Sequence, residues 1–199
     1  MSRAEEAVVD EATLIARVGR GDQRAFRVLV DAHGRAMHRL AWRMLLDASE
    51  AEDVVQEAFA RLWTGAPNWR AGEARVGGWL RRVCTNLCLD RLRRRRLWAE
   101  GEVPETADSR PLAPAVIDAT RLETAIADAL AALPDRQRAA LVLTYYEQMP
   151  NARAAELMEL NIKAFESLLL RSRAALRRQM ALRGFDGGDS SDSGEGEAA

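Results

Sequence analysis

Long apolar runs are absent from this chain. Among its 199 residues there is no stretch of about eighteen consecutive apolar residues, the length that a membrane-spanning helix needs. The first residues, MSRAEEAVVDEATL, are acidic, whereas a secretory signal opens with basic and then apolar residues. We therefore expect a cytoplasmic protein with no membrane span.

Cysteine and lysine are both scarce. The two cysteines, Cys84 and Cys88, lie one helical turn apart, which favours two small buried residues on one helix face over a disulfide. A zinc or redox site that includes His33 or His38 is the alternative. Lys163 is the only lysine among 29 basic residues, a bias that we attribute to the coding genome. Because of this bias, a single arginine carries little functional information.

The formal net charge of −1 conceals two opposed blocks of charge. Residues 47–60 contain five acidic residues and no lysine or arginine, a net charge of −5. Residues 66–98 contain nine arginines against Glu73 and Asp90, a net charge of +7. The charge of each segment therefore carries more information than the total.

Hydrophobic periodicity predicts an all-α protein of two small helical domains. The first domain covers residues 12–98 and the second covers 121–183. Between them, residues 99–120 are acidic and contain three prolines, a composition typical of a flexible linker. We expect a flexible N-terminus at 1–11 and a disordered acidic tail at 184–199.

Capping residues predict where the helices of the first domain begin. Asp22 is the expected N-cap of a long helix with one apolar stripe. Ser49 and Glu52 form an expected capping box at the start of a helix over 51–63. Gly77 and Gly78 predict a loop before a further helix.

The helix over 51–63 has an apolar face and an acidic face. The acidic face consists of Glu52, Asp53, Gln56, Glu57 and Ala60. With no interleaved lysine or arginine, its carboxylates gain nothing from i,i+4 pairing. The face is therefore either a solvated surface or a docking surface for a basic protein. A metal site on these carboxylates lacks a complete ligand set nearby.

The next helix, over 79–98, is rich in arginine. Its buried stripe is Leu80, Val83, Cys84, Leu87, Cys88 and Leu92, and its more exposed residues are Arg81, Arg82, Asn86, Asp90, Arg93 and Arg94. Arginines interleaved with Trp69 and Trp79 suit single-stranded nucleic acid, because cations meet phosphates and an aromatic residue or a shaped pocket takes an unstacked base. A solvated arginine-rich helix end is the alternative.

The second domain ends in two helices joined by a tight turn. A short helix over 151–160 is followed by a turn at Asn161 and Ile162 and by a longer helix over 163–182. This arrangement is typical of a helix-turn-helix whose second helix enters a DNA major groove, although any small helical hairpin can imitate it. The second helix has an inner stripe of Phe165, Leu168, Leu169, Ser172 and Leu176, with Lys163, Glu166, Ser167, Leu170 and Arg171 outward.

Three segments in order resemble the bacterial sigma-70 family of RNA polymerase sigma factors. SEAEDVVQEAFARLW at 49–63 resembles the second conserved region, and WLRRVCTNLCLDRLRR at 79–94 resembles the segment that follows it. LPDRQR at 133–138, with YYE at 145–147, resembles the start of the fourth region. The length and the linker are similar to those of the extracytoplasmic-function group, which keeps only these two regions.

This resemblance implies partners for the two faces of the first domain. It assigns the docking of the clamp coiled coil of RNA polymerase core to Asp53, Gln56 and Glu57. It assigns the melting of the minus-ten promoter element and capture of a flipped base to a loop and the helix after it. These positions are Asn68, Trp69 and Arg70 in the loop, and Asn86, Asp90, Arg91 and Arg94 in the helix.

In the second domain the resemblance assigns recognition of the minus-thirty-five element. The matching positions are Lys163, Glu166, Ser167 and Arg171, with Arg173 as a phosphate contact. Three positions depart from the family pattern: Pro150-Asn-Ala-Arg153 replaces Ser-x-x-Glu, Glu159 replaces the turn glycine, and Leu168 replaces a frequent basic residue. Glu159 therefore predicts a turn that is opened or redrawn.

The sequence as a whole predicts an alternative sigma factor without catalysis, cofactor or metal of its own. Its expected partners are RNA polymerase core, promoter DNA and an anti-sigma factor. A stand-alone helix-turn-helix regulator is the alternative, but it leaves the acidic face and the Trp-Arg segment without a role. A carboxylate-metal nuclease that uses Glu52, Asp53 and Glu57 is a third interpretation.

Overall fold

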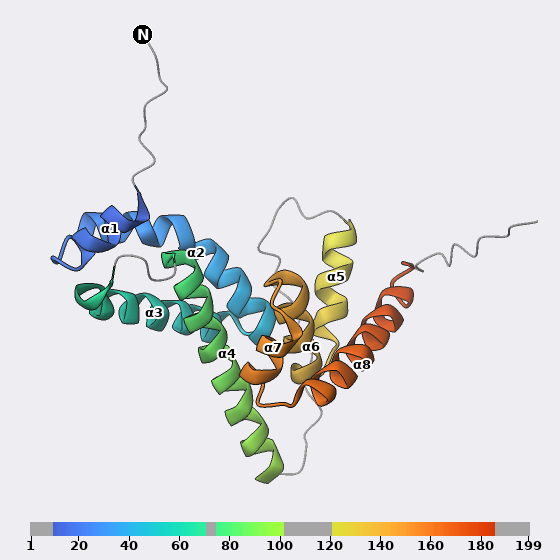
Figure 1. Cartoon of the computed structure of the whole chain (residues 1–199). Coiled ribbons are helices and arrows are strands. Elements are labelled where there is room, and N and C mark those ends of the chain that lie inside the picture. The colour runs from blue at the N-terminus through green and yellow to red at the C-terminus, as the bar shows by residue number, and fades with distance from the viewer. Residues whose placement is uncertain (1–9, 71–74, 102–120, 186–199) are drawn as a thin grey trace, which may run out of the picture.

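The computed structural model describes residues 10–70, 75–101 and 121–185, and these residues are helical without a strand among them. Figure 1 shows two groups of helices in contact, α1 to α4 from the first half of the chain and α5 to α8 from the second. Within the described ranges, no helix has both the length and the apolar character needed to cross a membrane. The all-α prediction is confirmed.

The first half is a bundle built around one long helix. Its elements are α1 (Glu11–Val18), α2 (Gln23–Leu45), α3 (Ala48–Gly65), the short 3-10 helix η1 (Ala66–Asn68) and α4 (Val76–Gly101). Helix α2 packs against α1, α3 and α4. Phe26 contacts the rings of Phe59 and Trp63 edge-on, at centroid distances of 6.1 and 5.1 Å. These contacts join the apolar faces of α2 and α3.

The predicted start of α2 is confirmed, and that of α3 is wrong. Asp22 accepts hydrogen bonds from the N–H groups of Arg24 and Ala25 at 2.9 and 3.1 Å. At α3 the N-cap is Asp47, whose carboxylate accepts from the N–H of Glu50 at 2.9 Å. The predicted capping box at Ser49 does not form, because Asp47 already lies in the extended conformation that an N-cap requires.

The predicted loop at Gly77 and Gly78 is also wrong, because both residues lie in the first turn of α4. A Cβ atom on Gly77 would lie 3.0 Å from Cε1 of His33. The absence of a side chain therefore lets α4 approach α2 closely, and here the glycine serves helix packing.

Both cysteines are structural, as predicted. Cys84 and Cys88 are free thiols buried on α4, and burial raises the pKa of Cys84 to about 12 and that of Cys88 further. His33 instead contacts Glu11, with Nε2 2.9 Å from Oε1. In the part of the chain that the structure describes, no three His, Cys, Asp or Glu side chains gather as a metal ligand set.

The second half is a smaller helical unit. Its elements are α5 (Arg121–Ala131), α6 (Asp135–Leu141), the single π-helical turn η2 (Val142–Tyr146), α7 (Asn151–Leu157) and α8 (Ile162–Ala181). Leu130 and Leu133 are buried, whereas Leu122 is 48% exposed. The buried residues on α5 are Ala125, Ala129 and Leu130, and this helix packs against α8.

The turn between α7 and α8 keeps its tight form without a glycine. Glu159 adopts a left-handed backbone with φ of 54°. The N–H of Glu159 donates to the carbonyl of Glu156 at 3.1 Å, and the N–H of Leu160 donates to that of Ala155 at 2.9 Å. The prediction of an opened turn is therefore wrong. These two bonds hold a conformation that costs a non-glycine residue about 1 to 2 kcal/mol.

The two halves share one continuous cluster of buried apolar residues. Helix α6 contacts both α2 and α4, and η2 contacts α2. Most of the predicted linker at 99–120 and of the predicted tail at 184–199 lies outside the described residues. The division into domains therefore stays a prediction.

Candidate nucleic-acid interface and protein docking face

The acidic face of α3 points to solvent. Asp53 and Gln56 are exposed, and the Asp53 side chain keeps 61% of its accessible surface. Glu57 is less exposed than these two residues, because its Oε1 atom forms an ion pair with Nη2 of Arg61 on the next turn. The expectation that this face gains nothing from i,i+4 pairing is therefore wrong for Glu57. Asp53 and Gln56 are the more accessible of the three predicted docking residues.

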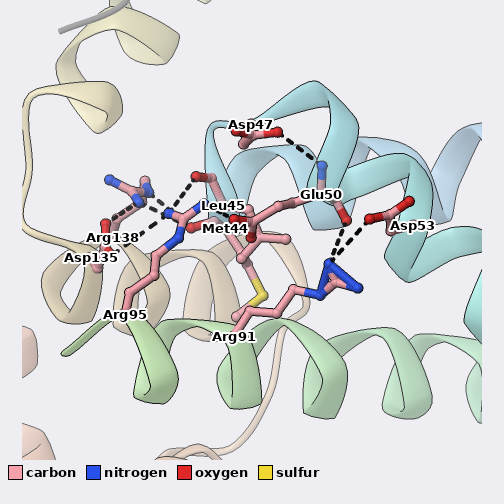
Figure 2. Close-up of polar contacts among 9 residues, drawn as sticks. All are labelled: Met44, Leu45, Asp47, Glu50, Asp53, Arg91, Arg95, Asp135 and Arg138. Atoms are coloured by element: carbon pink, nitrogen blue, oxygen red, sulfur yellow. Dashed lines mark hydrogen bonds and ion pairs between the residues drawn. The ribbon is translucent and has the colours of Figure 1, made fainter. Parts of the chain in front are cut away.

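Two arginines of α4 reach back to the junction between α2 and α3 (Figure 2). Arg91 donates to the carbonyl of Glu50 at 3.3 Å and lies 3.9 Å from Oδ2 of Asp53. Arg95 donates to the carbonyl of Leu45 at 3.0 Å and pairs with Glu50 at 2.9 Å. Both arginines therefore connect elements within the first half.

Arg91 consequently points away from Asn86 and Asp90, two of the other minus-ten residues predicted on α4. Helical spacing places Asn86, Asp90 and Arg94 on neighbouring parts of one face, with Arg91 turned toward α3. Arg94 also lines an open hollow of about 550 Å³ with Glu50, Arg91 and Arg95. Three guanidinium groups against one carboxylate make the hollow favourable for a phosphate.

The predicted minus-ten site leaves out two further cations of this face. Arg82 is exposed one turn before Asn86, and Arg93 lies two turns after it. Arg93 pairs with Asp90 at 3.1 Å. Arg82 lies four residues before Asn86, and Arg93 lies seven residues after it. This helical spacing indicates that both arginines share a face with Asn86.

The loop before α4 begins with the three predicted base-contact residues. Asn68 ends η1 and is exposed, as is Arg70. Trp69 is half-buried, with its ring edge-on to that of Trp79 at a centroid distance of 5.7 Å. The loop continues into residues 71–74, which lie outside the described ranges. The structure thus brings a partly accessible indole and two polar side chains to the start of α4.

Helix α8 presents a polar face to solvent. All five residues predicted to contact the minus-thirty-five element are exposed: Lys163, Glu166, Ser167, Arg171 and Arg173. Leu170 lies among them and is 65% exposed, a residue that the predicted site did not include. Its outward position in the helical repeat is the signal that could have added it. The guanidinium of Arg173 lies 6.0 Å from the ring centroid of Tyr145.

Acidic side chains of the second half contact arginines of the first. Glu147 pairs with Arg81 at 3.0 Å, and its side chain is only 10% exposed. Burial raises the pKa of Glu147, and the cations Arg81 and Arg43 oppose that rise. Glu159 in the helix-turn-helix turn pairs with Arg93 at 3.0 Å. Part of the basic surface of α4 is therefore covered.

Comparison with protein families identifies both halves. Sigma-70 region 2 matches residues 29–97, which include α3 and most of α4. Sigma-70 region 4 matches residues 123–176, which include α7 and most of α8. The two matches together cover more than half of the chain.

Individual relatives and solved structures agree with these matches. The chain is 35% identical over 170 residues to the ECF RNA polymerase sigma factor SigM of Mycobacterium tuberculosis, covering 84% of this chain and 83% of that one. It is 29% identical over 177 residues to the ECF RNA polymerase sigma factor SigW of Bacillus subtilis, covering 83% and 94%.

Among solved structures, the sigma factor RpoE of Bartonella quintana, in complex with the anti-sigma factor NepR, has the same fold. It aligns with a TM-score of 0.57 at 21% identity, covering 79% of this chain and 97% of that one. CnrH, in complex with the cytosolic domain of CnrY, aligns with a TM-score of 0.50 at 27% identity, covering 87% and 97%. The chain belongs to the extracytoplasmic-function (ECF) group of the sigma-70 family.

Proposed function

We propose that this chain acts as an alternative sigma factor, which binds RNA polymerase core and directs it to promoters in the cytoplasm. The observation that supports this role is the presence of three separate surfaces on three helices. They are the acidic face of α3, the Trp-Arg surface around α4, and the polar face of α8. A stand-alone helix-turn-helix regulator needs only the third. The role is one of recognition and strand opening, and it requires no catalytic group from this chain.

The acidic face of α3 is the proposed contact with the clamp coiled coil of core polymerase. Asp53 and Glu57 lie off the buried stripe of α3, so their removal leaves the core packing intact. We expect Asp53→Ala with Glu57→Ala to weaken core binding about tenfold or more. Asp31→Ala with Glu156→Ala is the matched control, because it removes two exposed acids elsewhere. Equal affinities of the two double variants for core would refute the assignment.

The minus-ten surface is proposed to combine the loop at Asn68, Trp69 and Arg70 with the face of α4 that carries Asn86, Asp90 and Arg94. Unstacking a base costs a few kcal/mol, so the surface must supply both a place for the base and cations for the strand. Arg82 and Arg93 add cations to the same face. For Arg91, the proposed contribution is a phosphate contact in the hollow beside Arg94 and Arg95.

The face of α8 is proposed to read the minus-thirty-five element in the major groove. Lys163, Arg171 and Arg173 supply cations for phosphates or guanine, and Ser167 supplies a hydroxyl. Glu166 is suited to accept a hydrogen bond from cytosine, and Leu170 is suited to contact a thymine methyl group.

Reconstituted transcription tests the function as a whole. Purified chain and core polymerase are incubated with a library of genomic fragments, and the transcripts are mapped at their 5′ ends. We expect starts preceded by a shared pair of sequence elements. The absence of promoter-specific transcripts would overturn the proposal. Gel-shift assays with and without core separate it from the stand-alone regulator, which binds duplex DNA unaided.

The structures that resemble this chain also suggest a regulator. RpoE of Bartonella quintana was solved with an anti-sigma factor, and we propose a partner of that kind for this chain. Such a partner would be detected by co-purification with the tagged chain from the source bacterium.

A further inference from the structure

Two tryptophan rings of the proposed minus-ten surface form a contact pair. Trp69 directly follows η1, and Trp79 lies near the start of α4. Their rings meet edge-on, with centroids 5.7 Å apart and an interplanar angle of 68°. Both side chains are half-buried. The position of the pair therefore depends on what fixes η1 on one side and the start of α4 on the other.

The end of α1 packs against η1 in a contact that only glycine permits. A Cβ atom on Gly19, which directly follows α1, would lie 2.8 Å from the carbonyl oxygen of Ala66 and 3.3 Å from Cα of Pro67. Gly19 has φ of −60° and ψ of −19°, a right-handed conformation that any residue adopts. The close approach of the two backbones, and not the conformation of Gly19, therefore requires a residue without a side chain.

The carbonyl group that Gly19 approaches also fixes the backbone of Trp69. The oxygen of Ala66 accepts a hydrogen bond from the N–H of Trp69 at 3.1 Å, and Ala66 itself is buried. An ordinary contact with a Cβ atom is 3.4 Å or more, so a side chain at position 19 would displace this oxygen by about 0.6 Å. Because the Trp69 amide is bonded to that oxygen, Trp69 would move with it.

A second contact connects α1 to the start of α4. A Cβ atom on Gly77 would lie 3.0 Å from Cε1 and 3.2 Å from Nδ1 of His33 on α2. The imidazole is not free to swing away, because its Nε2 atom lies 2.9 Å from Oε1 of Glu11, the first residue of α1. Trp79 follows Gly77 by two residues. Through Glu11 and His33, α1 therefore restricts the position of Trp79 as well.

Helix α1 is firmly attached to the rest of the bundle. Leu14, Ile15 and Val18 are buried in the core. Arg17 forms an ion pair at 2.8 Å with Asp22, the residue that caps α2. Since α1 is fixed relative to α2, it provides a rigid support for both tryptophans.

We propose that α1 positions the Trp69–Trp79 pair for base recognition in the minus-ten element, with Gly19 and Gly77 as positioning residues. Each glycine acts through a tryptophan and does not itself contact DNA. The inference rests on the proposed function for the identity of the DNA surface, whereas the support of the pair by α1 is a property of the free chain. A binding site must be held within about 0.5 Å of its productive geometry, so a displacement of the size expected at Ala66 is enough to weaken recognition.

Gly19→Ala is the sharpest perturbation, and Gly65→Ala is its matched control. Gly65 directly precedes η1, and a Cβ atom there would meet no atom within 4 Å. Gly77→Ala and Gly78→Ala form a second pair, because both glycines lie in the first turn of α4 and a Cβ atom on Gly78 would also meet nothing within 4 Å. Each pair adds the same methyl group with and without the close contact.

The first measurement is fluorine NMR of the free chain labelled with 5-fluorotryptophan. The variants Trp69→Phe and Trp79→Phe assign the two resonances. We expect Gly19→Ala to shift the Trp69 resonance, and Gly77→Ala to shift the Trp79 resonance, by more than a linewidth. The two control variants should leave both resonances within a linewidth of wild type. Resonances that Gly19→Ala and Gly77→Ala leave unmoved would overturn the support of the pair by α1.

The second measurement is base discrimination by the chain assembled with core polymerase. The probes are fluorescent fork-junction DNAs that carry a promoter from the mapped transcripts, with single-stranded minus-ten bases replaced one at a time. A base that stacks on an aromatic ring contributes roughly five- to 150-fold to affinity. At the most discriminating position we therefore expect a preference of about tenfold or more for wild type and Gly65→Ala, and of less than about threefold for Gly19→Ala. Wild-type discrimination by Gly19→Ala would overturn the proposal.

A rescue variant separates positioning from general damage to the fold. In the Gly77→Ala chain, His33→Ala removes the ring that the new Cβ atom meets, so the Trp79 resonance and the base preference should return toward wild type. Failure of this rescue would refute the route through His33. Affinity for core polymerase should stay at the wild-type value in every variant, because the docking face of α3 is unchanged. If Gly19→Ala does not fold, the Gly77→Ala variants carry the same test.

The two measurements also separate this inference from the proposed function. Shifted resonances together with a wild-type chain that has no base preference would refute the minus-ten function alone. A wild-type base preference together with unmoved resonances would refute the positioning role of α1 alone.

Discussion

Removing the guanidinium of Arg138 is the most direct test of what joins the two halves. The last carbonyls of α2 have no partner within that helix. Arg138 donates to the carbonyl of Met44, and it also donates to that of Leu133 at 2.9 Å and to Asp135. One side chain therefore satisfies a helix end in the first half and a turn in the second.

The expected magnitude follows from these bonds. A hydrogen bond to a charged group contributes about 1.5 to 3 kcal/mol, and Arg138→Ala leaves two buried carbonyls without that donor. The stabilisation from these hydrogen bonds is partly offset, because burial disfavours the charged guanidinium. Burial therefore lowers the pKa of Arg138, while the nearby carboxylate of Asp135 acts to raise it. We therefore expect Arg138→Ala to lose about 3 to 5 kcal/mol of unfolding free energy, the range for breaking a buried charged contact.

Urea unfolding followed by circular dichroism measures this loss. Arg138→Lys should fall between wild type and Arg138→Ala, because an ammonium group lacks the planar fork that spans both carbonyls. Arg136→Ala is the control, since Arg136 is exposed on the same turn of α6. If Arg138→Ala unfolds within about 0.5 kcal/mol of Arg136→Ala, the hydrogen bonds of Arg138 do not stabilise the folded chain.

Two further predictions concern single side chains. Leu170→Ala should weaken binding to the preferred minus-thirty-five duplex about fourfold for each thymine methyl group that Leu170 covers. Replacing those thymines by uracils should weaken DNA binding by wild type and leave DNA binding by the variant unchanged. Burial raises the pKa of Glu147 above its ordinary 4.5, so the folded chain holds this proton to higher pH than the unfolded chain does. As pH rises from 4.5 toward neutrality, wild type should therefore lose stability relative to Glu147→Gln, as measured by urea unfolding at each pH; parallel pH profiles would refute this.

Periodicity was sufficient to predict the helices because each buries one apolar face. The stripe of α2 and the inner stripe of α8 follow directly from the 3.6-residue repeat. Helix starts were harder to predict, because Asp47 and Ser49 are both good capping residues and only the backbone conformation selects between them. From the sequence alone, Gly77 is expected to break a helix. Its role in helix packing becomes visible only once His33 on α2 is seen to lie against it.

The candidate site was predictable where one helix carries it. The exposed face of α8 follows from sequence spacing alone, as does the exposure of Asp53 and Gln56 on α3. Arg91 was not predictable in this way, because its direction toward the carbonyl of Glu50 depends on how α4 crosses α3. Arg91 therefore shows that a basic residue within a proposed nucleic-acid-binding segment can also be part of the scaffold.

The contacts between the halves are least visible in the sequence, for a physical reason. Glu147 and Glu159 lie 66 residues from their partners Arg81 and Arg93, and neither acid belongs to a charge block or a helical repeat. Only the fold brings them to α4. The surplus of positive charge on α4, which the sequence shows plainly, therefore includes arginines that pair with acids from the second half of the chain.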